Sequence, residues 1–404
     1  MTASPEEPTF AAPSGDVTHR VWFAQALRGV AALIVVLEHL TQDFINAQPV
    51  VSALAFTRPI TSLPAPPLRE IPQRLALYSI SPGIFAVGLF FLISGFVIPF
   101  SLERRTLGGF VVRRFFRLYP TLWACMALTT AAVVVLSGHH GFPYSGATLA
   151  TNAVLVPTYA GKGFVDPVYW TLVIEELFYV CAAVMASRGL LHRRATLVAL
   201  AGGLAAMAMW IGNPRTPTPA HPEVVDHYVL RFHLGFNSTF VLFILIGVVL
   251  HQHYRRVWGT LDCVALGAGL LGLFYACLHH GPFKGNEPAV FFACAVAALV
   301  VVLVLYVLRD RVPYSRTADR LAEISYPLYL IHTIVGWVML AALTRATGQF
   351  YVALAITFPT VVLVAVAVHH FVEKPSMRLG RRIAGAPRFR RKDRELPAPE
   401  PAVG

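Results

Sequence analysis

The sequence predicts an all-α polytopic membrane protein with about ten transmembrane helices, and three observations lead to this fold class. Of the 404 residues, 56% are hydrophobic and 13% are charged, whereas a soluble domain carries about 25% charged residues. The hydrophobic residues gather in runs of about twenty, the length that a helix needs to cross a bilayer. Lysine and arginine are concentrated in every second segment between these runs, as the positive-inside rule describes.

Ten runs meet this length criterion. The predicted spans are 21–44, 82–101, 118–137, 168–187, 194–212, 234–252, 260–279, 288–308, 323–344 and 352–372. The segment 45–81 is rich in proline and too long for a simple hairpin, so we expect it to fold over the outer mouth of the protein. Residues 147–158 are apolar but too short to span the membrane, which predicts a re-entrant or interfacial segment.

The basic residues predict that both termini are cytoplasmic. In this orientation the cytoplasmic segments hold 24 Lys/Arg and the outer segments hold eight, so the net charge of +12 reflects topology and nucleic acid is not an expected partner. Residues 1–20 lack the apolar core of a cleavable signal peptide. We therefore expect a disordered cytoplasmic segment 1–20, a membrane domain 21–372 and a basic, proline-rich cytoplasmic tail 373–404, with the protein in the cell (plasma) membrane.

One face of the first span carries polar side chains along an otherwise apolar helix. Arg28 and His39 are eleven residues apart, which at about 100° per residue places them on one face, about 16 Å apart along the axis. A charged group near the bilayer centre costs at least about 2.5–3.5 kcal/mol and normally faces a protein cavity. A neutral imidazole can take the proton of a hydroxyl that attacks a carbonyl. His39 is therefore the predicted general base, and a hydrogen-bonded structural histidine is the alternative.

A cytoplasmic basic cluster contains Arg114 and Arg117, which are three residues apart and share one helical face. Guanidinium groups bind phosphate oxygens in a bidentate way. The pair is therefore a candidate binding site for the phosphates of a nucleotide-like donor. Ordinary positive-inside charge explains the same residues equally well.

Two adjacent carboxylates, Glu175 and Glu176, lie in the fourth span. Because neighbouring positions on a helix are about 100° apart, we do not expect both side chains to face the same cavity. One of them is expected to pair with Arg28 or to orient His39, as the third member of a catalytic constellation does. A purely structural ion pair is the alternative.

The ninth span contains His332 and two tyrosines, and a hydrogen-bonded core histidine is the slightly favoured interpretation. We keep His332, together with Trp170 in the fourth span, as candidates for substrate binding. The five cysteines all lie within or at the edge of apolar runs, which indicates packing residues rather than disulfides or a metal site. We expect no bound metal.

Five stretches of the sequence follow one another in a fixed order: LRGVAALIVVLEH, FFLISGFVI with RRFFRLYP, WTLVIEELFYV, ISYPLYLIH and VEKP. In this order and at this spacing they resemble the acyltransferase-3 family of integral-membrane acyltransferases. The resemblance extends over about 21–382. No hydrolase-like domain follows the tenth span, so the chain resembles the stand-alone members of the family.

The resemblance implies transfer of an acyl group, usually acetyl from acetyl-coenzyme A, to a hydroxyl of a glycan or a secondary metabolite. The family's arginine–ten residues–histidine motif falls on Arg28 and His39, its cytoplasmic arginine pair on Arg114 and Arg117, and the carboxylate of its tryptophan-led motif on Glu175. The expected co-substrate is therefore acetyl-CoA, and the expected acceptor is a cell-surface or exported glycan.

These expectations combine into one mechanism. Coenzyme A binds from the cytoplasm with its phosphates on Arg114 and Arg117, and its pantetheine arm passes Arg28. The acceptor enters from the outer side, His39 acts as general base, and Glu175 steadies the imidazole. Direct transfer is favoured over a covalent relay because no serine or cysteine stands out as a nucleophile. The alternatives are a macrolide-type acceptor, or a transporter or flippase that uses the polar stripe as a path.

Overall fold

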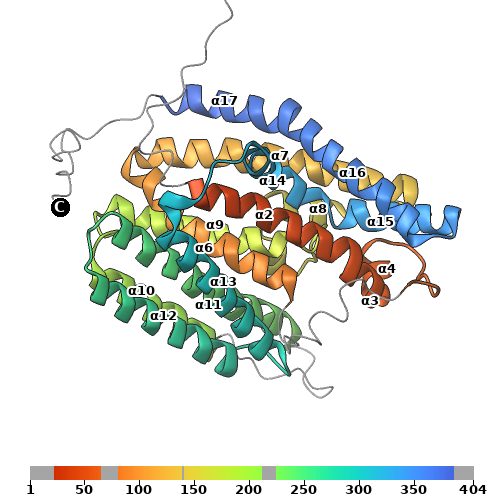
Figure 1. Cartoon of the computed structure of the whole chain (residues 1–404). Coiled ribbons are helices and arrows are strands. Elements are labelled where there is room, and N and C mark those ends of the chain that lie inside the picture. The colour runs from red at the N-terminus through yellow and green to blue at the C-terminus, as the bar shows by residue number, and fades with distance from the viewer. Residues whose placement is uncertain (1–21, 65–80, 139–140, 212–223, 386–404) are drawn as a thin grey trace, which may run out of the picture.

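The computed structural model describes residues 22–64, 81–138, 141–211 and 224–385, and no strand occurs within these ranges. Nine helices in this part of the chain are long and apolar enough to cross a membrane, and a bent pair of helices can provide a tenth span. The long helices lie side by side (Figure 1). The predicted all-α polytopic membrane fold with about ten spans is confirmed. The expectations for 1–20, for 65–80 and for the tail beyond 385 lie outside the described residues.

The first half of the chain contains α2 Trp22–Glu38, η1 His39–Asp43, α3 Phe44–Asn46, α4 Gln48–Leu54, α6 Pro82–Glu103, α7 Leu107–Leu136, α8 Gly146–Ala153, η2 Thr158–Ala160, α9 Tyr169–Ser187, α10 Arg194–Ala206 and η3 Met207–Ile211. The second half contains α11 Val224–Tyr254, α12 Thr260–His280, α13 Glu287–Val307, η4 Arg309–Arg311, α14 Arg316–Ile331, α15 Ile334–Thr347, α16 Phe350–Val368, η5 His369–Glu373 and α17 Lys374–Ile383. The elements η1, η3 and η5 are π-helical turns.

Several predicted spans differ in their bounds from the observed helices, and two of these differences bear on the site. The third, α7, begins eleven residues before the predicted start at 118, because Thr106 caps it by accepting a hydrogen bond from the amide of Gly109 at 3.2 Å. The ninth is broken between Ile331 and Ile334, where α14 and α15 meet at 71°. Hydropathy detects neither feature, because it reports the length of an apolar run and not the hydrogen bonds within it.

We name the two ends of the bundle by their residues. The arginine side is the end at which α2 and α7 begin, at Trp22 and Leu107. The histidine side is the end at which α6 and α9 begin, at Pro82 and Tyr169. The π-helical turn η1 lies at the histidine end of α2, and the break between α14 and α15 lies at the histidine end of α14.

Central helices pack closely because small residues lie at their crossings. A Cβ atom at Gly29 would lie 2.9 Å from the carbonyl oxygen of Ala318 and 2.9 Å from the amide of Ala322, so glycine lets α2 contact the backbone of α14. Gly95 and Gly247 allow the same close approach between α6 and α11. This packing places Arg28, the neighbour of Gly29, in the interior rather than on the lipid-facing surface.

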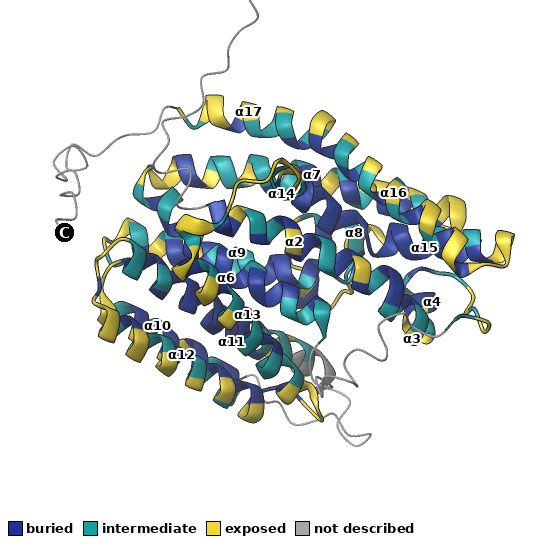
Figure 2. Cartoon of the chain, viewed as in Figure 1, coloured by how far each residue is buried: buried dark blue, intermediate teal, exposed yellow. Residues whose placement is uncertain are grey.

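The periphery of the bundle is exposed (Figure 2). Helices such as α10, α12 and α17 show exposed residues on their outward faces, whereas α6 and α11 are largely buried. Large hydrophobic side chains are among the most exposed, including Leu261 at 86%, Phe371 at 81% and Val135 at 75%. Such a surface suits a lipid environment, and in water it would promote aggregation.

Candidate active site

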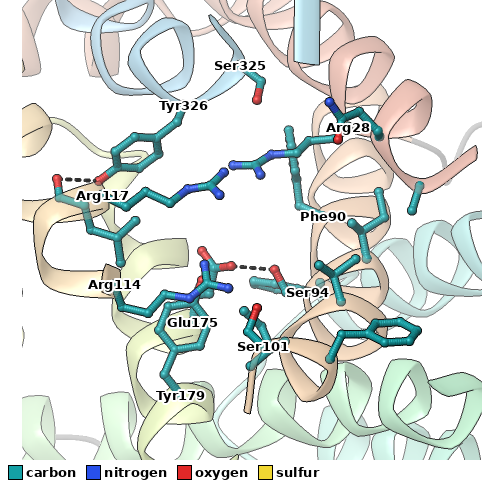
Figure 3. A pocket seen from close by; sticks show the side chains of 18 of the residues that line it. Arg28, Phe90, Ser94, Ser101, Arg114, Arg117, Glu175, Tyr179, Ser325 and Tyr326 are labelled. Atoms are coloured by element: carbon teal, nitrogen blue, oxygen red, sulfur yellow. Dashed lines mark hydrogen bonds between the residues drawn. The ribbon is translucent and has the colours of Figure 1, made fainter. Parts of the chain in front are cut away.

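A cavity of about 990 Å³ lies between α2, α6, α7, α9 and α14 (Figure 3). Its lining extends from Trp22 and Arg105 near the arginine side to Val87 and Thr171 nearer the histidine side. We call this space the donor cavity, after the phosphorylated donor for which its arginines are the predicted binding site. All three residues predicted to bind the cofactor line it: Arg28, Arg114 and Arg117.

Positive charge dominates the donor cavity. Its lining includes five arginines and two carboxylates, namely Arg28, Arg104, Arg105, Arg114, Arg117, Glu175 and Asp319. Arg105 lies between α6 and α7, where burial and the nearby guanidinium groups of Arg113 and Arg114 lower its pKa. A group of cations that disfavour one another is stabilised by a bound polyanion, so the cavity is suited to a phosphorylated ligand.

Aromatic rings contact Arg114, one of the two predicted phosphate-binding arginines. The early start of α7 places Arg114 and Arg117 on a helix rather than in a loop. The Arg114 Cζ atom lies 4.9 Å from the centroid of the Tyr179 ring and 5.6 Å from that of Phe110. The side chain of Arg117 extends across the cavity toward Arg28 (Figure 3). Guanidinium groups from α2 and α7, far apart in sequence, therefore meet in one space.

The two adjacent carboxylates of α9 face different surroundings, as their spacing predicts. Glu175 lines the donor cavity, and its Oε1 accepts a hydrogen bond of 2.5 Å from the hydroxyl of Ser94. In Figure 3 its carboxylate lies beside Arg114. Glu176 is not among the described residues that line this cavity. Glu175 is therefore part of the donor cavity.

His39 lies beyond the donor cavity, at the first residue of the π-helical turn η1. It is not among the described residues that line the cavity with Arg28. Its Nδ1 lies 2.6 Å from Oδ2 of Asp43. The expectation that Glu175 orients His39 needs correction, because Asp43, four residues further along the same helix, occupies this position.

The partner of Nδ1 determines the tautomer of His39. An ionised carboxylate only accepts hydrogen bonds, so Nδ1 carries the hydrogen and donates it to Asp43. The lone pair of the neutral imidazole is then on Nε2. The backbone carbonyl of His39 is also fixed, because it accepts a hydrogen bond of 2.8 Å from Nε1 of Trp337. These two contacts give the imidazole of His39 a defined orientation, with Nε2 as the basic nitrogen.

His332 is fully buried beside His39, and the centroids of the two rings are 5.1 Å apart. Its Nδ1 lies 2.9 Å from the carbonyl oxygen of Tyr329, and its Nε2 lies 3.1 Å from Oγ1 of Thr333. A carbonyl only accepts, so Nδ1 donates and Nε2 accepts from the threonine. His332 has the satisfied hydrogen bonds of a core histidine and also lies next to the candidate base.

Asp166 stabilises the break between α14 and α15, which positions His332 beside His39. Its carboxylate is fully buried and accepts hydrogen bonds of 3.2 Å from the amides of Val168 and Ile334. Ile334 is the first residue of α15, so Asp166 caps that helix from a distant part of the chain. Burial raises the pKa of Asp166 to about 7, against a usual value of 3.8.

Trp170, the other candidate for substrate binding, lines a second cavity of about 330 Å³ instead of the donor cavity. Its ring lies 5.4 Å from the rings of Phe236 and Phe240 and 6.2 Å from that of Phe91, which lines the donor cavity. Trp170 is thus part of the aromatic wall between two cavities. The structure does not bring it into contact with His39 among the ring contacts of the described residues.

Sequence reasoning missed Asp43, Asp166 and Trp337. Asp43 could have been found, since His39 and Asp43 have the spacing of four that places two helical side chains together. Asp166 and Trp337 could not, because they reach the site from segments more than 100 residues away and no local pattern marks them.

Comparisons with known proteins identify the family of the chain. The sequence profile of a family described as an acyltransferase domain matches residues 21–369. The chain is 25% identical over 326 residues to Nodulation protein 10 of Rhizobium leguminosarum bv. viciae, and the alignment covers 74% of this chain and 83% of that relative. No solved structure matches the chain. Because the profile covers most of the sequence, the protein belongs to the acyltransferase-3 family of membrane acyltransferases.

Proposed function

We propose that the protein transfers an acyl group, in particular acetyl, from acyl-coenzyme A to a hydroxyl of a cell-surface or exported glycan. One observation carries this proposal. A cavity lined by five arginines extends from one side of the bundle toward an imidazole on the other side, and a carboxylate holds Nδ1 of that imidazole. The first feature suits a phosphorylated donor, and the second suits a general base.

The donor cavity fits coenzyme A in charge and size. Its volume of about 990 Å³ is at the upper end of the range for small-molecule sites, about 300–1,000 Å³. Arg114 and Arg117 would bind the phosphates, and Arg28 with Ser94 would line the path of the pantetheine arm. Glu175 then contributes to donor binding, through Ser94 and the nearby arginines, instead of orienting the base.

The positive-inside rule assigns the sides of the membrane. It places the arginine side, with both chain termini, in the cytoplasm and the histidine side outside. Acyl-coenzyme A would enter from the cytoplasm and the acceptor from the outside. We propose the plasma membrane as the location, because an exported glycan is accessible there.

The proposed chemistry is direct transfer with His39 as general base. Nε2 of His39 takes the proton of the acceptor hydroxyl while the oxygen attacks the thioester carbonyl. The carbon–sulfur bond then breaks, the imidazolium returns its proton to the thiolate, and the products are an ester and free coenzyme A. Asp43 stabilises the imidazolium that forms between these two steps, and the neutral His332 beside it adds no competing charge.

The test uses purified protein in lipid nanodiscs with radiolabelled acetyl-CoA and a panel of neutral oligosaccharides and macrolides. We expect release of free thiol and an equal amount of labelled ester on a member of the panel. His39→Gln should lower this rate by about 10²–10⁴, whereas His370→Gln, at an exposed histidine, should leave it unchanged.

Three results distinguish the alternatives. Labelled macrolide in place of labelled oligosaccharide would correct the acceptor class and leave the chemistry intact. Movement of label across a vesicle membrane without any ester or thiol would indicate a transporter. Full activity of His39→Gln would refute the assignment of the base.

A further inference from the structure

The histidine end of the donor cavity is closed by three side chains. Three of the lining residues toward that end are Phe90 on α6, Thr171 on α9 and Tyr329 on α14. Tyr329 lies in the last turn of α14, three residues before His332. Tyr329 therefore lines the donor cavity and also contacts His332, which in turn contacts His39.

Tyr329 makes contacts on both sides of this boundary. Its ring lies 5.7 Å from that of Phe90 in the donor cavity and 5.7 Å from that of His332 on the other side. The ring of His332 in turn lies 5.1 Å from that of His39. One phenol thus separates the space for the donor from the pair of imidazoles.

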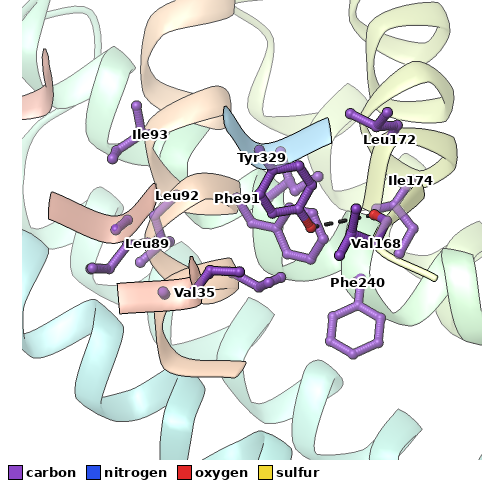
Figure 4. Packing of buried hydrophobic residues seen from close by; sticks show 14 of the residues in the cluster. Val35, Leu89, Phe91, Leu92, Ile93, Val168, Leu172, Ile174, Phe240 and Tyr329 are labelled. Atoms are coloured by element: carbon purple, nitrogen blue, oxygen red, sulfur yellow. Dashed lines mark hydrogen bonds between the residues drawn. The ribbon is translucent and has the colours of Figure 1, made fainter. Parts of the chain in front are cut away.

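A triangle of hydrogen bonds fixes this phenol. The hydroxyl oxygen of Tyr329 lies 2.8 Å from Oγ1 of Thr171 and 3.3 Å from the carbonyl oxygen of Val168, and the Thr171 hydroxyl lies 3.0 Å from that same carbonyl. Figure 4 shows Tyr329 reaching from α14 toward Val168 at the start of α9. The two hydroxyls carry one hydrogen each, so two of the three contacts are hydrogen bonds at any time, and at least one of them involves the hydroxyl of Tyr329.

We propose that Tyr329 is a gate between the donor cavity and His39. While the triangle is intact, the thioester stays on the donor side and water that reaches His39 does not meet it. When the phenol leaves Thr171 and Val168, the acyl end of the donor can pass to the imidazole pair. This proposal rests on the proposed acyl transfer, and it explains how a cavity that ends before His39 can still supply the reaction. Closure of this kind protects a reactive group from hydrolysis.

The local backbone is suited to such a movement. Pro327, two residues before Tyr329, lies inside α14 and cannot donate a backbone hydrogen bond. The carbonyl oxygen of Tyr329 is bound by the side chain of His332 at 2.9 Å. A shift of Tyr329 would therefore be transmitted to His332, and the gate and the imidazole pair would move together.

The test measures thiol release from acetyl-CoA without acceptor, which reports hydrolysis by leaked water. Tyr329→Phe and Thr171→Val each remove one hydroxyl of the triangle and should raise this hydrolysis about 2- to 10-fold, the factor expected for one hydrogen bond. The double variant should show little further increase, because both changes break the same triangle. Tyr329→Ala removes the ring and should raise hydrolysis by more than either.

Two controls make the result specific. Tyr144→Phe removes a hydroxyl that also donates to a backbone carbonyl, that of Val165 at 3.2 Å, but lies outside the donor cavity, and it should not change hydrolysis. Adding His39→Gln to Tyr329→Ala should abolish the extra hydrolysis, because the leaked water must still be activated at the base. Persistence of that hydrolysis would contradict a gate in front of His39.

The outcomes also separate the gate from the proposed function. If wild-type protein transfers acetyl groups and hydrolysis stays within twofold of wild type in Tyr329→Phe and Thr171→Val, the gate is refuted and the function stands. If wild-type protein releases no thiol from acetyl-CoA with any acceptor of the panel, the proposed function itself fails. Tyr329→Phe and Thr171→Val keep the test decisive even where Tyr329→Ala does not fold.

Discussion

The donor cavity and the imidazole pair differ in how their polar groups are satisfied. The cavity of about 990 Å³ is lined by five arginines and two carboxylates, so its lining carries more positive than negative charge. At the imidazole pair, Nδ1 of His39 and both ring nitrogens of His332 have partners within the chain. The first arrangement suits the capture of an external anion, and the second holds a proton at a defined atom.

The backbone differs between the two regions as well. Most residues that line the donor cavity lie in regular helical turns, whereas His39 begins a π-helical turn and His332 lies at a 71° break. Irregular turns of this kind are frequent at functional sites because they redirect side chains that a regular helix would present elsewhere. Binding of the donor therefore depends on charge, and the chemical step depends on local geometry. The predictions below test this separation.

The largest expected effect in this comparison concerns Asp43. Asp43→Asn removes the charge that fixes the tautomer of His39, and we expect kcat to fall on the order of 10²-fold, the scale for loss of a partner that orients a functional histidine. The KM for acetyl-CoA should not change, because Asp43 is remote from the donor cavity. Steady-state kinetics of acetyl transfer measure both constants.

Asp262→Asn is the matched control, since Asp262 forms a surface ion pair with Arg194 at 2.6 Å. It should leave both constants near wild type. An equal loss of kcat in the two variants would show that the Asp43 effect is structural and not an effect on the base.

The next effect concerns the donor cavity. Arg117→Gln should raise the KM for acetyl-CoA about 10- to 10²-fold, which corresponds to loss of a hydrogen bond to a charged group, with kcat nearly unchanged. Arg188→Gln removes an exposed arginine outside the cavity and reports the effect of net charge alone. A similar rise in KM for both variants would mean that the cavity has no specific phosphate site.

The smallest expected effect is the pH dependence of stability at Asp166. Its pKa is raised to about 7 from a usual 3.8, so the folded state holds this proton more tightly than the unfolded state. The contribution to the free energy of unfolding is therefore greatest below about pH 4 and is lost as the pH rises through about 7. Asp166→Asn should lower stability by about 0.5–2 kcal/mol through loss of the cap on α15.

Thermal unfolding in detergent at pH 5 and pH 8 measures this effect. The deficit of Asp166→Asn should be smaller at pH 8, because only the wild-type protein then ionises a buried carboxyl. Asp310→Asn, at a side chain that is 66% exposed, should show no such change. A deficit of equal size at both pH values would contradict the raised pKa as the cause.

The sequence predicted the membrane fold and the residues of the donor cavity because both depend on patterns within one helix. The spacing of three residues between Arg114 and Arg117 places both on one face of a helix. The different surroundings of Glu175 and Glu176 follow from the angle of about 100° between adjacent helical positions. The geometry around His39 could not be predicted in this way. The run 323–344 is apolar enough overall to be taken as one span, so its hydropathy does not locate the break that Asp166 caps from another segment. The partner of His39 was assigned to Glu175, although the spacing of four residues between His39 and Asp43 on one helix already indicates the observed partner.

The central claim is that the two regions serve two substrates from opposite sides of the membrane. The most direct test uses sealed proteoliposomes with the protein in one orientation, the acceptor identified in the panel inside or outside, and acetyl-CoA supplied to one side at a time. We expect labelled ester only when acetyl-CoA is on the arginine side and the acceptor is on the histidine side, with free thiol released on the arginine side. Ester formation that requires both substrates on the same side would contradict the account.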